Sequence, residues 1–155
     1  MYQVVKDSLH RQGKALGVLR ELIEEEYGYL LKHDTDSVAH IEFSIQELIR
    51  QLALEKACVI RTLGGMRVRE YALALSEEQA EVIETLYNII DDGEQDTARL
   101  ASRNAELAMA FVSQSNRMLH GLTDQVIKEK SEVYGRKGYM RMGVHPEASL
   151  ISGRL

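Results

Sequence analysis

The sequence has few of the residues that interrupt or cross-link a chain. Tryptophan is absent, aromatic residues make up 6% of the 155 residues, and the single proline, Pro146, lies near the C-terminus. The single cysteine, Cys58, excludes a disulfide within the chain and a thiolate metal cluster, and we expect it to be a core or boundary residue. With no proline before residue 146 to break a helix, the chain is free to form long helices.

Long apolar runs are missing as well. No stretch approaches the roughly 18 apolar residues that a membrane span requires, and the N-terminal residues lack the apolar core and cleavage site of a signal peptide. The formal net charge is −5, and because basic residues gather near the C-terminus, the rest of the chain is more acidic still. An acidic body repels phosphate backbones. We therefore expect a cytoplasmic protein that binds no nucleic acid and has no membrane span.

Residue patterns typical of catalysis are not found. A metal-carboxylate bundle places Glu three residues before His, and the nearest match among the five histidines is Asp7 before His10. Gly64-Gly65 follows a helical pattern, whereas a phosphate-binding loop follows a strand. Ser-x-Gly elbows and Cys-His dyads are likewise missing. We predict no enzymatic activity, no metal and no cofactor, and expect the function to lie in surfaces.

Two amphipathic helices are predicted in the first half of the chain. Apolar residues recur at helical spacing from about Val4 to Lys32 and again from Val38 onward. The predicted core positions are Leu9, Leu16, Leu19, Ile23, Tyr27 and Leu30 in the first helix and Val38, Ile41, Ile45, Leu48, Leu52 and Val59 in the second. The polar stretch 33–37 is rich in N-capping residues, which predicts a break and an antiparallel pair. The alternative is one continuous helix with a polar patch.

A third long helix is predicted after a connection. Gly64 and Gly65 are expected to end the second helix, and Met66 to Leu75 is either a short helix or an extended connection. Ser76 followed by Glu77, Glu78 and Gln79 resembles a capping box. The apolar pattern of the new helix is interrupted at 91–96 and then resumes. The glycine in this stretch either bends the helix or merely leaves it exposed to solvent. That later row contains Leu100, Asn104, Leu107, Phe111, Met118, Leu122 and Val126.

These patterns predict an all-α protein. We expect an antiparallel bundle of about three long helices with a short extra helix or connection, in a domain spanning residues 1–134. A flexible C-terminal arm, 135–155, follows; because it keeps apolar residues that disordered tails usually lack, it either packs on the body or meets a partner.

The last helix is apolar over an unusually wide angle. Six apolar residues follow one another from Leu107 to Val112, which is more than one helical turn. Either the internal core or a partner helix covers this face. We name as candidate binding residues Leu107, Phe111, Met118, Leu119, Leu122 and Val126. The same face would also serve a self-assembling coiled-coil scaffold or adaptor, which is the alternative function.

Two short motifs carry a family resemblance. Arg103-Asn104 lies within the third long helix, and Tyr134-Gly135-Arg136-Lys137-Gly138 follows it. With these motifs and its pattern of leucine-rich helices, the chain resembles the FlgN family of flagellar export chaperones. It departs from that family at Ala105, where glycine usually follows Arg-Asn.

The resemblance implies a cytoplasmic, non-enzymatic chaperone. Its clients would be the hook-filament junction proteins FlgK and FlgL, bound through their C-terminal segments and delivered to the export gate protein FlhA. The candidate face would then bind the client, and a monomer or a weak homodimer is expected. The arm would contact the client or the gate through Tyr134, Tyr139, Met140 and Met142.

Overall fold

The computed structural model describes the backbone of residues 1–135 and the side chains of residues 1–128, and within that part all regular secondary structure is helical. The helices are α1 (Tyr2–Leu31), α2 (Thr35–Thr62), α3 (Val68–Leu73) and α4 (Glu77–Gly135). The predicted all-α class is confirmed, and none of these helices is apolar enough over a sufficient length to cross a membrane. The predicted arm lies outside the described residues except for Gly135, which ends α4.

The chain divides into two compact units, Met1–Val112 and Ser113–Leu155. Unit 1 contains α1, α2, α3 and the first part of α4, whereas the described part of unit 2 is the remainder of α4. This division falls inside the helical domain that we expect to span residues 1–134, and that domain boundary stays a prediction.

A capped turn separates α1 from α2. The Asp34 side chain accepts a hydrogen bond from the Ser37 backbone N–H at 3.1 Å and another from the Ser37 hydroxyl at 2.7 Å. His33, just before this cap, has a left-handed backbone with φ of 55°. The left-handed residue lets the chain turn between the two helices. The Asp34 carboxylate then satisfies amides at the start of α2 that would otherwise lack partners. The alternative of a single continuous helix is wrong.

The two glycines after α2 also act as predicted. Gly64 and Gly65 have φ of 61° and 87°, a conformation that L side chains rarely adopt, and α2 ends at Thr62, two residues before Gly64. The ambiguous segment that follows forms the short helix α3. The long helix α4 then begins at Glu77, directly after Ser76 as expected, and continues without interruption through residues 91–96.

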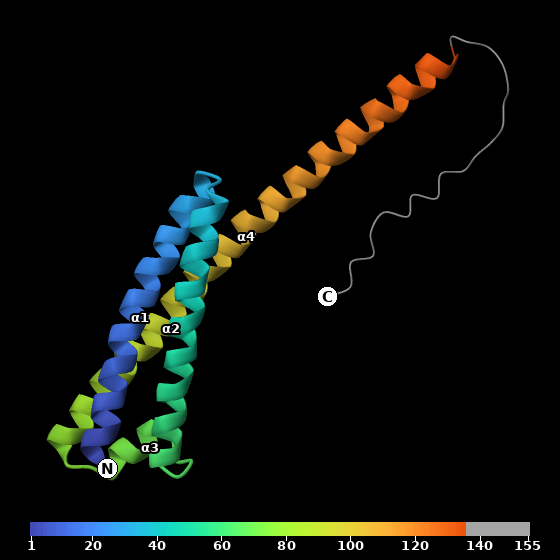
Figure 1. The fold of residues 1–155 in the computed structure, drawn as a ribbon. Helices are drawn as coiled ribbons and strands as arrows, with labels where there is room; N and C mark the ends of the chain where they lie inside the picture. The colour runs from blue at the N-terminus through green and yellow to red at the C-terminus, as the bar shows by residue number, and fades with distance from the viewer. Residues whose placement is uncertain (136–155) are drawn as a thin grey trace. The chain divides into compact units, whose positions relative to one another are not determined.

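Part of each predicted stripe is buried in the core of unit 1, whereas the predicted core residues Tyr27, Leu30, Val38, Leu48 and Leu52 are only half-buried. Figure 1 shows α1 and α2 side by side, with α3 close to the N-terminus. Near the start of α1, the Arg11 guanidinium and the Ser8 hydroxyl donate hydrogen bonds to the carboxylate of Glu55, which lies near the end of α2. The two helices are therefore antiparallel. The buried apolar residues are Val5, Leu9, Leu16, Leu19, Ile23, Ile41, Ile45, Val59, Leu63, Tyr71, Ala72, Ile83, Ile90 and Leu100.

Within unit 1, α4 runs in the same direction as α1. Gly93 lies against Leu16. Further along both helices, the Asn104 side chain donates hydrogen bonds to Ile23 and Glu26. A β-carbon added at Gly93 would lie 3.3 Å from the Cβ and Cδ1 atoms of Leu16. The glycine in the polar stretch 91–96 therefore does not interrupt α4. It provides room for a leucine of α1.

Candidate functional site

The described part of unit 2 presents an apolar stripe. Met118, Leu119, Leu122 and Val126 follow one another at spacings of one, three and four residues, which places them within about 100° of one another around a helix. Their side chains are all more than half exposed, from 51% at Val126 to 63% at Met118. We call these four residues the unit 2 stripe. Apolar surface of this kind is typical of a surface that binds a partner.

The other side of this helix is polar. Arg117, His120 and Asp124 fall away from the stripe on the helical wheel, and all three are exposed. Ile127, which is 60% exposed, is the apolar exception on that side. The segment is therefore amphipathic, with its apolar side available to a second amphipathic helix.

Two of the predicted binding residues belong to unit 1. Leu107 and Phe111 are half-buried, and the Phe111 ring packs on the His33 ring with centroids 4.3 Å apart. Met109 and Val112 beside them are 70% and 61% exposed. The six-residue apolar run is thus partly covered by the turn between α1 and α2 and partly exposed.

A buried polar cluster fastens α4 to α1 in unit 1. The Asn104 amide nitrogen donates to the Ile23 carbonyl oxygen at 2.7 Å and to the Glu26 carboxylate at 2.8 Å. The Arg103 guanidinium lies 3.8 Å from the centre of the Tyr27 ring, within cation–π range. Asn104 is 3% exposed. The Arg-Asn motif therefore has a structural role that the sequence did not reveal, because its partners lie about 80 residues earlier in the chain.

Glu26 is the titratable group of this cluster. Burial raises the pKa of its carboxyl, the hydrogen bond from Asn104 lowers it, and the nearby Glu42 carboxylate raises it again, with a net increase above the ordinary value. The ionised form is therefore less favourable here than in water.

A comparison with protein-family models matches residues 1–141 to the family described as FlgN protein. The chain belongs to the FlgN family. No curated protein and no solved structure matches it. Membership in this family implies a flagellar chaperone, as the resemblance of its motifs predicted.

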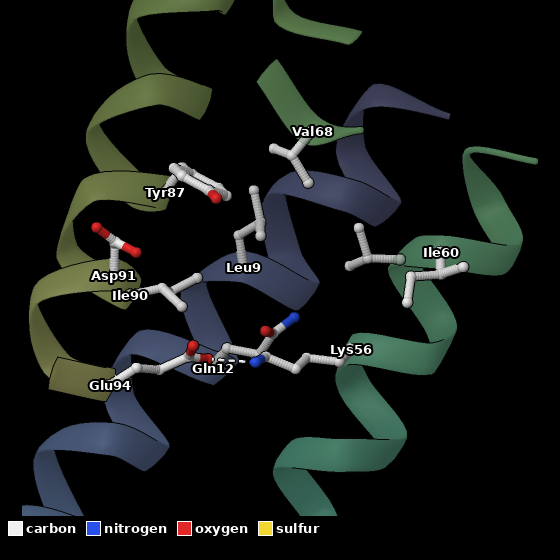
Figure 2. A pocket seen from close by; sticks show the side chains of 10 residues that line it. Leu9, Gln12, Lys56, Ile60, Val68, Tyr87, Ile90, Asp91 and Glu94 are labelled. Carbon is white, nitrogen blue, oxygen red and sulfur yellow. Dashed lines mark ion pairs between the residues drawn. The ribbon is translucent and has the colours of Figure 1, made fainter. Parts of the chain in front are cut away.

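Unit 1 of this FlgN family member also contains a cleft of about 270 Å³. Figure 2 shows it among α1, α2, α4 and the start of α3, with the Lys56 ammonium and the Glu94 carboxylate paired at 2.5 Å across one side. Its lining is mainly apolar, and includes Leu9, Val59 and Ile90. Because its cation is already paired with a carboxylate, the cleft presents no free charge at that position. Among the described residues, no group of three or more His, Cys, Asp or Glu side chains is arranged to hold a metal ion.

The predicted arm residues are only partly described. Tyr134 lies in the last turn of α4, and its side chain is outside the described part. Tyr139, Met140 and Met142 lie entirely outside the described residues. Their roles stay predictions.

Proposed function

We propose that this FlgN family member is a cytoplasmic export chaperone for hook-filament junction proteins of the FlgK and FlgL type. It would bind the C-terminal helical segment of each client and deliver it to the export gate protein FlhA. The unit 2 stripe is the observation that supports this proposal most directly. Four adjacent apolar side chains, each more than half exposed, give an amphipathic client helix a surface on which to bury its own apolar face.

The binding mode is helix against helix. Met118 adapts its shape readily, because methionine is unbranched and flexible, so one stripe can accept related clients. Leu119, Leu122 and Val126 supply the remaining apolar contact. Leu107 and Phe111 are further client contacts proposed on unit 1, where their exposed portions remain available. A specific interface buries roughly 800 Å² on each partner.

The arm has a second proposed role. Tyr134, Tyr139, Met140 and Met142 would contact the client or the gate protein.

Calorimetric titration with a peptide from the C-terminal segment of a FlgK-type protein tests the proposal. The unaltered chain should bind it, and Leu122→Asp should weaken binding by about 2 kcal/mol or more, because a charge would face the apolar client. Ile127→Asp is the matched control, since Ile127 is as exposed as Leu122 but lies away from the stripe. Equal losses in both variants, or no binding by the unaltered chain at tens of micromolar, would contradict the proposal.

Self-assembly through the same stripe is the alternative function. Measurement of the mass in solution separates the two: a monomer or weak homodimer is expected of the chaperone, and a tight oligomer dissociated by Leu122→Asp would favour a scaffold.

A further inference from the structure

The cleft in unit 1 has apolar walls that come from four helices. Leu9 of α1, Val59 of α2, Val68 of α3 and Ile90 of α4 all line it, around a volume of about 270 Å³. Figure 2 shows Tyr87 and Ile90 pointing from α4 toward Leu9 on α1. Pockets for drug-sized ligands are usually larger, at roughly 300–1,000 Å³, whereas an apolar cavity of about 150 Å³ holds a benzene ring. The volume therefore suits a single large side chain.

One buried amide in this cleft has an acceptor to spare. Gln12 lines the cleft and is 2% exposed, and its amide nitrogen donates to the Ser8 hydroxyl at 3.4 Å. No hydrogen bond to the Gln12 amide oxygen is present among the described residues. Every fully enclosed side-chain polar atom in that part of the chain has a partner, so this oxygen is reached from the cleft, where Figure 2 shows the amide among the lining side chains. A ligand with an N–H or O–H group would satisfy it.

The rim of the cleft carries one carboxylate without a cation. Lys56 pairs with Glu94, whereas Asp91 has no cation within ion-pair distance among the residues whose side chains are described. Arg69 is placed over the Tyr87 ring, with its guanidinium carbon 4.9 Å from the ring centre. The rim therefore favours a positive charge beside whatever group enters the cleft.

We propose that this cleft binds a tyrosine or tryptophan side chain of a protein partner, presented next to a lysine or arginine. Only these two side chains combine a large apolar body with one uncharged donor. The ring would lie beside Leu9 and Ile90, and its O–H or N–H group would donate to the Gln12 amide oxygen. The neighbouring cation would lie near Asp91.

Two further points support a protein partner. Tyrosine and tryptophan are among the residues that most often carry the binding energy of protein interfaces. The chain also belongs to a chaperone family, whose function is to bind proteins. The cleft lies in unit 1 alone, so this site goes beyond the proposed function and can be tested without the FlgK-type client.

Chemical-shift titration of the full chain with capped tripeptides tests the site. Acetyl-Lys-Tyr-Gly-amide should shift the signals of the cleft residues with millimolar affinity. It should bind about fivefold tighter than acetyl-Lys-Phe-Gly-amide, which lacks the donor. Acetyl-Glu-Tyr-Gly-amide should bind about threefold more weakly than the lysine peptide, because its charge has the same sign as that of Asp91.

Variants of the chain locate the contacts. Gln12→Met keeps the length of the side chain and removes the acceptor, so it should bind the Tyr and Phe peptides equally. Gln3→Met is the matched control, since Gln3 is an exposed residue of the same helix, and it should keep the preference for tyrosine. Asp91→Asn should remove the preference for lysine over glutamate and leave the preference for tyrosine unchanged. If Gln12→Met fails to fold, as circular dichroism would show, the peptide series with the unaltered chain decides alone.

Three results would overturn the inference. Cleft signals that do not shift at tens of millimolar peptide would show that the cleft binds no such side chain. Equal binding of the Tyr and Phe peptides by the unaltered chain would remove the hydrogen bond to Gln12, and with it the ligand class. Binding of p-cresol as tightly as the tripeptide would assign the cleft to small phenols instead of a protein segment. None of these results bears on client binding by the unit 2 stripe, so the proposed function would stand or fall separately.

Discussion

The two parts of α4 have the same kind of apolar pattern but differ in what covers it. In unit 1, Ile83, Ile90 and Leu100 are 0%, 6% and 8% exposed, because they belong to one buried apolar cluster with residues of α1, α2 and α3. In unit 2, Met118 and Leu122 continue the three-four spacing and are more than half exposed. Apolar periodicity therefore identifies the face of a helix that is built for packing, but it does not say which chain provides the partner.

The largest expected effect comes from truncating one apolar residue in each part. Ile83→Ala should lower the free energy of unfolding by about 2–5 kcal/mol, since it removes a fully buried side chain and leaves a cavity. Leu122→Ala should change it by less than about 0.5 kcal/mol, because the side chain is exposed in the free protein. Urea denaturation of both variants measures the difference. Equal losses would show that both parts are packed alike.

The polar cluster gives the next largest contrast. Asn104→Leu removes the donor to the Ile23 carbonyl and to the buried Glu26 carboxylate, which should cost about 1–3 kcal/mol of unfolding free energy. The matched change Asn116→Leu, at an exposed position of unit 2, should cost little. Denaturation curves of the two variants compare them directly. A neutral Asn104→Leu would show that the hydrogen bonds add nothing to the packing of α4 on α1.

Alanine at the two glycines should act in opposite directions. Gly93→Ala should lower the unfolding free energy by about 1–2 kcal/mol, because the Leu16 Cβ is fixed to its backbone and cannot turn aside. Gly121→Ala meets no described atom and should leave stability unchanged or slightly higher. Thermal unfolding followed by circular dichroism measures both. A stabilised Gly93→Ala would show that Leu16 has room to shift.

The smallest expected effect concerns Glu26. Because its pKa is raised on folding, the stability that this carboxyl contributes is present at low pH and is lost as the pH rises through the folded-state pKa. Glu26→Gln keeps an acceptor for Asn104 and removes the charge beside Glu42. Its Tm at pH 7 should therefore increase by about 2–4 °C, with the gain disappearing near pH 4.

Glu21→Gln serves as the control on the same helix, since Glu21 is exposed, and it should change Tm little at either pH. A lower Tm for Glu26→Gln at pH 7 would mean that the ionised carboxylate stabilises the cluster.

Much of unit 1 could be predicted from local sequence. The stripe containing Leu9, Leu16 and Ile23 is buried, Asp34 caps α2, and Gly64 and Gly65 end it, because spacing, capping and backbone freedom are properties of neighbouring residues. These features need no knowledge of which helix lies beside which. They can therefore be predicted from the sequence, although α2 begins at Thr35, three residues before the apolar pattern that starts at Val38.

Contacts between distant residues could not be predicted in the same way. Asn104 stands in an apolar row, and nothing near it in sequence indicates a bond to Ile23, 81 residues away. Gly93 sits in a polar stretch that resembles a break, and only the position of Leu16 explains it. The candidate binding residues fall into covered and exposed groups for the same reason. Phe111 packs on His33 within unit 1, whereas Met118 is exposed.

Hydrogen exchange along α4, measured with and without the FlgK-type client peptide, tests the central claim most directly. In the free chain, amides of residues 113–128 should exchange much faster than those of residues 83–104, because apolar packing covers only the latter. Saturating peptide should slow exchange in 113–128 specifically. Strong protection of 113–128 in the free monomer, unchanged by the peptide, would contradict the claim that this segment is kept open for a client.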